Sequence, residues 1–132
     1  MTEPFPAEAA EGSRSEPGDG AAVQVPSGQP VTFQEVVWNA PGPEGLAVRF
    51  RFIAPEIAAE TGSVDFAAAS EDMLWLCQNF ALPRIAEGGP QPTQIIVSLA
   101  DRDLPFGEAA PEATQFFEAY RVENGTCIWE AF

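Results

Sequence analysis

The sequence predicts an α+β domain of two layers, in which one main helix packs on an antiparallel sheet and the elements follow the order ββαβββ. Three observations favour this fold. Residues 46–53 place apolar side chains at every second position, as in a strand with one buried face. Apolar residues recur at helical spacing between Asp65 and Ala81. Near the C-terminus, Asn124-Gly125 lies between two runs of β-forming residues and predicts a hairpin.

The first 22 residues are predicted to form a disordered acidic tail or linker that precedes a single domain over residues 23–132. The tail consists mainly of Pro, Gly, Ala, Glu and Ser, with Phe5 as its one aromatic residue. Such a composition buries too little apolar surface to offset the entropy lost on ordering. The chain has 132 residues, of which 45% are hydrophobic, and this is enough for one domain with a core of its own.

Two strands open the predicted domain. After a Pro- and Gly-containing turn at residues 26–30, residues 31–38 are rich in β-branched and aromatic side chains and predict the first strand. A loop over residues 39–45, which also contains Pro and Gly, separates it from the second strand at 46–53.

The main helix is predicted to begin after a short helical turn at residues 55–60. Asp65 is a good N-cap, and the helix is expected to run to Ala81, because Pro83 stops it. Its apolar side chains fall in one narrow stripe that would face the sheet: Phe66, Met73, Cys77 and Phe80, flanked by Ala69 and Leu76.

The last third of the chain predicts three strands. Residues 93–100 form a mostly buried strand, residues 101–111 are irregular, and strands at 116–123 and 126–132 form the hairpin. The two-residue turn sets the register of this hairpin and brings two pairs together on one face: Val122 with Cys127, and Tyr120 with Trp129.

The absence of histidine and lysine excludes several kinds of chemistry. Without histidine there is no Ser-His or Cys-His nucleophile pair and no imidazole metal site. Without lysine there is no Schiff base and no phosphate-binding P-loop lysine. No cofactor is expected.

Charge narrows the class of partner. The chain carries 20 acidic residues against six arginines, for a net charge of −14. Such a surface repels phosphate backbones and anionic bilayers, so nucleic acid and membrane surfaces are poor partners, whereas a basic protein or a cation is favoured. Solubility alone is the alternative explanation of this charge. No apolar run approaches the roughly 20 residues of a membrane span, and no secretory signal opens the chain as written.

The two cysteines are predicted to form a disulfide. Cys77 lies in the apolar stripe of the helix, and Cys127 points inward from the hairpin, so both face the same core. Two buried free thiols are the alternative, and with no histidine the pair makes a poor metal site. A disulfide would place the protein outside the cytosol.

Carboxylates supply the only candidate cation ligands. Asp101, Asp103 and Glu108 follow a predicted strand and are weak candidates for a hard cation such as Ca²⁺. The competing interpretation, which we prefer, is an acidic turn whose side chains bond to backbone N–H groups. Glu35, Glu118 and Glu130 lie on strands, but no feature of the sequence places a catalytic pair of carboxylates in a pocket.

Aromatic residues supply the candidate partner surface. The chain has three Trp and ten Phe, more than one small helix–sheet interface easily covers. Leu74 and Trp75 lie off the main helical stripe, where they would flank the core or meet a partner, and a patch around Trp75 or around Phe117 on the hairpin would be the partner surface. The competing interpretation is an aromatic ring that lies flat over the margin of the sheet.

Several stretches carry a family resemblance: VPSGQPVTFQEVVW, LAVRFRFIAPEI, the DF…DM…LC segment of the helix, and QIIVSLADRDLPFGEAAPEATQFFEAYRVENGTCIWEAF. Through them, residues 25–132 resemble a family of small, uncharacterised alphaproteobacterial proteins. Its members typically look exported, with a signal peptide, and some carry an acetolactate synthase label. The residues do not support that label, since such enzymes are several times longer and bind thiamine diphosphate. The resemblance implies export and no activity.

These observations together predict an exported, periplasmic, disulfide-bonded module that performs no catalysis. Its expected role is to bind a protein partner, a basic one being electrostatically favoured, or to form part of an envelope assembly. The alternative is a small carboxylate-dependent enzyme or a weak divalent-cation-binding domain that uses Asp101, Asp103 and Glu108. A deep acidic pocket would favour the enzyme, and a shallow apolar patch around Trp75 or Phe117 would favour binding.

Overall fold

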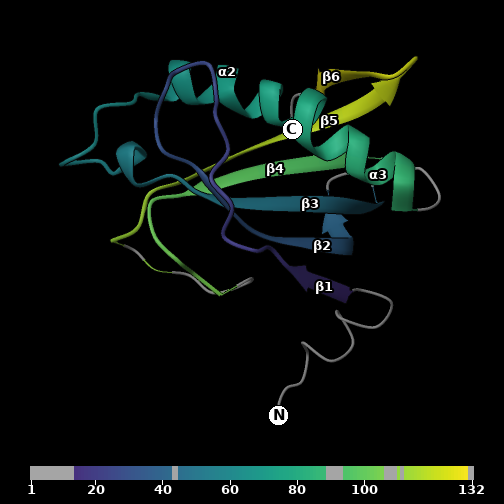
Figure 1. Cartoon of the computed structure of the whole chain (residues 1–132), viewed down its shortest axis with the longest axis horizontal. Coiled ribbons are helices and arrows are strands. Elements are labelled where there is room, and N and C mark those ends of the chain that lie inside the picture. Colours follow the sequence, from purple (N-terminus) through teal and green to yellow (C-terminus); the bar gives the residue numbers. More distant parts are fainter. Residues whose placement is uncertain (1–13, 43–44, 89–93, 106–109, 111, 131–132) are drawn as a thin grey trace, which may run out of the picture.

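The structure, a computed structural model, describes residues 14–42, 45–88, 94–105, 110 and 112–130. Six strands form one sheet, the helices pack on one of its faces, and the last two strands form a hairpin (Figure 1). The predicted α+β class with a C-terminal hairpin is thereby confirmed.

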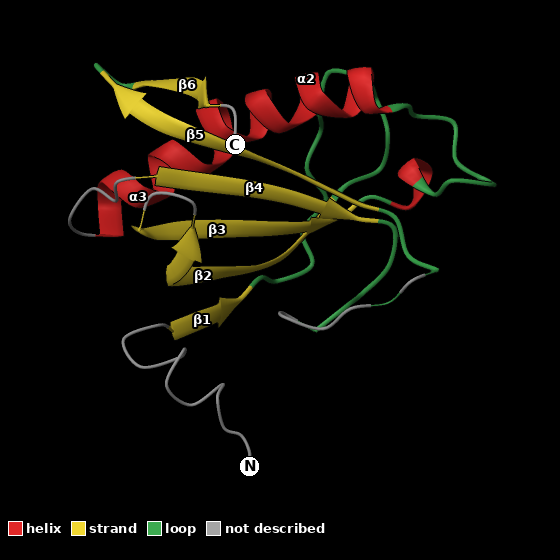
Figure 2. Cartoon of the chain, turned by 180° about the vertical axis from the view of Figure 1, so that it is seen from behind, coloured by secondary structure: helices red, strands yellow, loops and turns green. Residues whose placement is uncertain are grey.

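Ten elements make up the described chain: β1 (Arg14–Pro17), β2 (Thr32–Gly42), β3 (Gly45–Ile53), η1 (Pro55–Ile57), α2 (Phe66–Leu76), η2 (Cys77–Ala81), α3 (Leu82–Gly88), β4 (Gln94–Ala100), β5 (Gln115–Glu123) and β6 (Thr126–Glu130). The strands lie in the sheet in the order in which they occur in the chain. Neighbouring strands are antiparallel except β3 and β4, which are parallel. The sheet is thus mixed, because the helical segment between β3 and β4 returns the chain to the end of the sheet from which β3 started (Figure 2).

Strand β1 lies inside the segment predicted to be disordered. It pairs with β2 from Arg14 opposite Trp38 to Pro17 opposite Glu35, and the Gly18 N–H donates to the Gln34 carbonyl at 2.8 Å. Main-chain pairing of this kind needs no apolar side chain, so composition does not detect it. The expectation for residues 1–22 is therefore corrected from Arg14 onward, while residues 1–13 lie outside the described part.

The predicted loop over residues 39–45 is largely strand. β2 and β3 continue pairing beyond Ala40 opposite Ala47 to Gly42 opposite Gly45, and the short connection at 43–44 lies outside the described residues. Pro41 lies near the end of β2, beyond Trp38, the position at which the described part of β1 begins its pairing.

The main helix begins where predicted and continues past its predicted end. The Asp65 side chain accepts a hydrogen bond from the Ala68 N–H at 3.0 Å and caps α2. After α2, η2 is a π-helical turn in which the Leu82 N–H donates to the carbonyl of Cys77, five residues earlier. Pro83 follows this π-helical turn as the second residue of α3 and does not stop the helix, which continues to Gly88.

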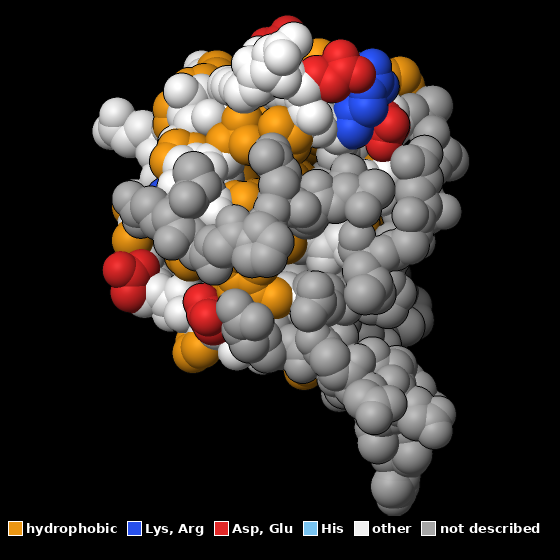
Figure 3. Space-filling view, turned by 90° about the vertical axis from the view of Figure 1, so that its right-hand side faces the viewer, with side chains coloured by type: hydrophobic (Ala, Val, Ile, Leu, Met, Phe, Trp, Pro, Cys, Tyr) orange, Lys and Arg blue, Asp and Glu red, His pale blue; other side chains and the backbone are white. Residues whose placement is uncertain are grey.

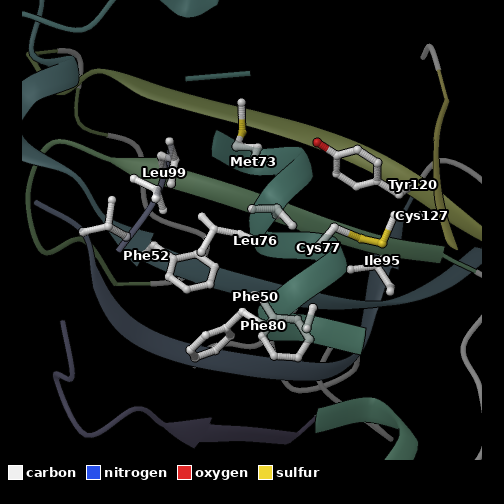
Figure 4. Packing of buried hydrophobic residues seen from close by; sticks show 14 of the residues in the cluster. Phe50, Phe52, Met73, Leu76, Cys77, Phe80, Ile95, Leu99, Tyr120 and Cys127 are labelled. Carbon is white, nitrogen blue, oxygen red and sulfur yellow. A yellow bond between two sulfur atoms is a disulfide. The ribbon is translucent and has the colours of Figure 1, made fainter. Parts of the chain in front are cut away.

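The core lies between the helices and one face of the sheet (Figure 4). Alternate residues of β3 and β4 meet the buried stripe of the helix, as the two periodicities predict. The largest members include Phe50, Phe52, Ile95, Leu99, Met73, Leu76, Phe80 and Tyr120. Phe66 was placed in the stripe by its spacing, but its side chain is 48% exposed and contacts Phe116 at the margin of the core, with ring centroids 5.0 Å apart.

A buried carboxylate ties the N-terminal turn to the helix. The Asp72 side chain on α2 is fully buried and accepts three hydrogen bonds: from the Ser27 N–H at 2.9 Å, the Ser27 hydroxyl at 2.6 Å and the Gln29 Nε2 at 2.7 Å. Gln29 is itself buried. These bonds position residues 26–30 against α2 and satisfy a charge that would otherwise be costly inside the protein.

Candidate functional site

The disulfide joins the helix layer to the last strand. Cys77 at the start of η2 and Cys127 in β6 are bonded, with Cα atoms 6.3 Å apart, as the sequence predicts. Beside it, Gln78 accepts a hydrogen bond from the Cys127 N–H at 2.9 Å and donates one to the Gly125 carbonyl at 2.9 Å. The bridge and Gln78 together hold the hairpin against the helices.

A groove lies between α2 and this hairpin. We call it the α2–hairpin groove, and its volume is about 320 Å³. Its lining consists of Phe66, Ser70, Glu71 and Leu74 from α2, Glu118 and Tyr120 from β5, and Trp129 from β6. Four large hydrophobic side chains in the described part of the chain are exposed, and three of them line this groove: Phe66 at 48%, Leu74 at 44% and Trp129 at 54%.

Helix and strand periodicity together build the groove. Phe66, Ser70 and Leu74 are four residues apart and therefore lie along one side of α2, next to its buried stripe. Glu118 and Tyr120 are two residues apart on the helix-facing side of β5, and Trp129 lies opposite Tyr120. The register set by the Asn-Gly turn thus brings Trp129 to the groove.

Glu118 supplies a carboxylate to this apolar surface. It accepts a hydrogen bond from the Trp129 indole Nε1 at 3.0 Å and another from the Ser70 hydroxyl at 3.3 Å. In the part of the chain that the structure describes, no arginine forms an ion pair with Glu118. Its hydrogen-bond donors are therefore neutral, and its charge faces the groove without a cation.

Tyr120 contributes a phenol. Its side chain is almost fully buried yet lines the groove. Burial, and secondarily the negative charge of Glu118, raise the pKa of Tyr120 well above its ordinary value. The hydroxyl is therefore protonated at neutral pH.

We expect Tyr120, the one tyrosine in the chain, to resist ionisation until the protein unfolds. Because the pKa of Tyr120 is higher in the folded than in the unfolded chain, the fold keeps its full stability below the unfolded-state pKa of about 10. The free energy of unfolding then falls as pH rises further. Near-ultraviolet absorbance of tyrosinate, followed together with far-ultraviolet circular dichroism, tests this. Glu118→Gln should lower the pKa of Tyr120, and an ordinary tyrosine titration in the folded wild-type protein would contradict the burial described above.

The two residues of the predicted partner surface lie apart. Trp75 is half-buried and packs against the core from α2. Phe117 lies opposite Ser98 of β4, whose neighbours Val97 and Leu99 belong to the core, so Phe117 points to the face of the sheet away from the helices. The Phe117 side chain is 45% exposed, and Trp75 and Phe117 form no common patch.

Arginines gather on the same sheet face as Phe117. The guanidinium of Arg49 lies 5.3 Å from the Phe117 ring centroid, and burial, with the nearby charge of Arg51, lowers the pKa of Arg49 to about 10. Arg51 is buried, forms an ion pair with Glu35 and donates to the Leu104 carbonyl at 2.7 Å. These contacts join two arginines, an acid and an aromatic ring on the face of the sheet away from the helices.

The predicted cation ligands do not converge in the described structure. Asp101 accepts hydrogen bonds from Arg102 at 2.9 and 3.3 Å, and these bonds hold the pKa of Asp101 below its ordinary value. Asp103 accepts one from the Gln34 side chain at 2.8 Å, and Glu108 lies outside the described residues. Throughout the described ranges, no group of three or more acidic or cysteine side chains is arranged to hold a metal ion.

The three glutamates predicted to lie on strands, Glu35, Glu118 and Glu130, also lie apart from one another. Glu118 lies in the groove, whereas Glu35 pairs with Arg51 on the other face of the sheet. Glu130 accepts a hydrogen bond from the buried Gln94 side chain at 2.8 Å, and Gln94 lies opposite Ala47 on that same face. No pair of these three acids shares a site.

Sequence reasoning missed the groove as a site, although its signals are present. The predicted register already places Trp129 opposite Tyr120 on the inner face, and strand alternation adds Glu118 to that face. The exposure of Phe66 and Leu74 depends on how far the hairpin extends along α2, which no local pattern specifies.

Comparison with known proteins identifies one family and no individual relative. A family of unknown function (DUF6497) matches residues 5–132. No curated protein and no solved structure matches the chain. Among the described residues, the helices are too short or too polar to cross a membrane.

Proposed function

Because the chain belongs to DUF6497, a family of unknown function, we propose its role from its own geometry. The protein is a non-enzymatic module that binds a protein partner through the α2–hairpin groove. The observation that carries this proposal is the gathering of Phe66, Leu74 and Trp129, each roughly half exposed, on one groove.

An apolar surface of this kind is costly to leave in water. Scattered exposed hydrophobic residues are ordinary on proteins, but a contiguous group beside a concavity is typical of a binding site. The groove volume of about 320 Å³ is at the lower end of the range for ligand pockets. It suits one or two side chains of a partner better than a cofactor. On the face of the molecule drawn in Figure 3, hydrophobic side chains reach the surface near Asp and Glu side chains.

The disulfide supports a location outside the cytosol. Bonds of this kind persist in oxidising compartments such as the periplasm and are rare where thiols are kept reduced. An exported module, free in the periplasm or within an envelope assembly, is consistent with the Cys77–Cys127 bridge and with the high net negative charge.

A carboxylate-dependent enzyme is the second candidate, since Glu71 and Glu118 both line the groove. The apolar character of the other groove residues and the engagement of Asp101 and Asp103 by neighbouring side chains favour binding over catalysis.

Site-specific photocrosslinking of the full chain tests the proposed function. Leu74→p-benzoylphenylalanine places a photoreactive group in the groove on a side chain that is already exposed, so folding should be unaffected. Irradiation of cells of the source organism should give a protein adduct of one defined mass, and Trp129→Ala in the same chain should reduce its yield several-fold.

The matched control is Glu60→p-benzoylphenylalanine, at an exposed loop position outside the groove. It should give no such adduct. The same substitution at Phe117 probes the other face of the sheet. An adduct from position 117 and none from position 74 would overturn the groove as the partner site, as would equal adducts from positions 74 and 60.

A further inference from the structure

We propose that the α2–hairpin groove binds one basic side chain of the partner, a lysine or an arginine, with its charge at Glu118 and its apolar stem against Phe66, Leu74 and Trp129. This inference rests on the proposed function and names the chemistry of the segment that enters the groove. Three features of the described residues carry it: the charge of the lining, the free acceptor positions of Glu118 and the apolar surface beside it.

The charge of the groove selects a cation. Its lining contains two carboxylates, Glu71 and Glu118, and no basic residue, in a protein of net charge −14. Anionic ligands are repelled by such a surface and cations are attracted. Four of the chain's arginines are engaged elsewhere, so they do not neutralise the groove: Arg51 with Glu35, Arg84 over the Phe80 ring, Arg102 with Asp101, and Arg121 with Glu123. In this proposal a basic side chain of the partner supplies the cation.

The geometry at Glu118 leaves room for a charged donor. Each carboxylate oxygen accepts one hydrogen bond, one from Trp129 and one from Ser70, although a carboxylate has about four acceptor positions. An ammonium or guanidinium group would add charge-assisted hydrogen bonds, which are about twice as strong as neutral ones. The existing bonds hold the carboxylate in position before any ligand arrives.

The apolar lining suits the stem of a basic side chain. Lysine and arginine lay their methylene groups along apolar surface while the charged end stays near polar groups. Phe66 and Leu74 supply such surface from α2, and the exposed indole of Trp129 supplies an aromatic face that also attracts cations. A neutral apolar side chain would use this surface but would leave Glu118 without a charged partner.

Tyr120 adds a neutral polar residue to the lining. Its side chain is 1% exposed and lines the groove beside Glu118, and burial keeps its hydroxyl protonated at neutral pH.

Two small probes of nearly equal shape and different charge test the proposal. n-Butylguanidinium carries an arginine-like cation, and n-butylurea is its neutral counterpart. Each is titrated into the full chain at physiological salt while the Trp129 indole N–H signal is followed by NMR. We expect n-butylguanidinium to bind about fivefold more tightly than n-butylurea, an effect of the size given by one partly screened ion pair.

Variants separate the groove from the general charge of the protein. Glu118→Gln should abolish the difference between the two probes, whereas Glu60→Gln removes the same charge outside the groove and should preserve the difference. Glu71→Gln removes the other carboxylate of the lining at an exposed position. It should reduce the difference between the probes and provides a second reading if Glu118→Gln does not fold.

Failure of this inference is distinct from failure of the proposed function. Equal binding of the two probes, or no shift of the Trp129 signal with either, overturns the basic-side-chain site. If the photocrosslinked adduct at position 74 still forms, the groove takes an uncharged segment of a protein partner. A charge difference that persists in Glu118→Gln also overturns the site, because the attraction then comes from the surface as a whole.

Discussion

Replacing Cys77 and Cys127 by alanine should lower the free energy of unfolding by about 4 kcal/mol. The bond closes a loop between residues 50 positions apart, and without it the unfolded chain regains the conformational freedom of that loop. A loss of this size is a large part of the stability of a typical domain, about 5–15 kcal/mol. Urea unfolding followed by circular dichroism measures it.

Reduction of the wild-type protein provides the control for this prediction. Both cysteines are buried, so alanine also removes packing atoms, whereas a reductant breaks the bond without changing the composition. The reduced protein should unfold at a clearly lower urea concentration. Equal midpoints for the oxidised and reduced proteins would show that the bridge contributes nothing to stability. The Trp129 indole signal should also broaden on reduction, because the bond holds β6 beside the helices.

Asp72→Ala should destabilise the protein by about 3 kcal/mol. The substitution removes an acceptor from three hydrogen bonds and leaves the Gln29 side-chain amide buried without a partner on that side. The turn at residues 26–30 should then detach from α2. Urea unfolding gives the free energy, and amide hydrogen exchange at Ser27 and Gln29 should accelerate more than exchange in the sheet.

The neighbouring acid provides a matched control. Glu71 has the same charge and lies one position earlier on α2, but its side chain is exposed. Glu71→Ala should therefore change stability by about 0.5 kcal/mol or less. If both variants lost similar stability, the removal of a carboxylate from α2, and not the loss of the buried hydrogen bonds of Asp72, would account for the lower free energy of unfolding.

Much of the fold follows from local patterns. The Asn124-Gly125 turn has positive φ at both residues, 53° and 74°, as a two-residue hairpin turn requires, and the observed register of Val122 with Cys127 follows from it. The Asp65 cap and the placement of Cys77 toward the sheet follow from helix chemistry and spacing.

The parallel pairing of β3 and β4 could not be read in the same way. Alternation in residues 46–53 is equally compatible with a parallel or an antiparallel neighbour. The uniformly buried β4 does carry a hint, since continuous apolar runs are typical of parallel strands covered on both faces. The buried role of Asp72 is similarly hidden, because its partners Ser27 and Gln29 lie 45 and 43 residues away and Glu71 beside it looks the same in sequence.

The candidate site was the least predictable part for the same reason. The sequence predicts a partner surface around Trp75 or Phe117, yet Trp75 packs on the core and Phe117 lies on the far face of the sheet. The groove depends on the meeting of two distant segments, α2 and the hairpin, and neither carries its shape alone.

The bonds of Gln78 have a consequence for self-association. Among the described strands, β6 has a neighbour on one side only, and such a margin is a template on which a strand from another molecule adds and starts a fibre. The Gln78 amide occupies the Cys127 N–H and the Gly125 carbonyl at this margin, so an incoming strand would first have to displace it. The side chain that secures the hairpin thereby also discourages polymerisation of the protein through its last strand.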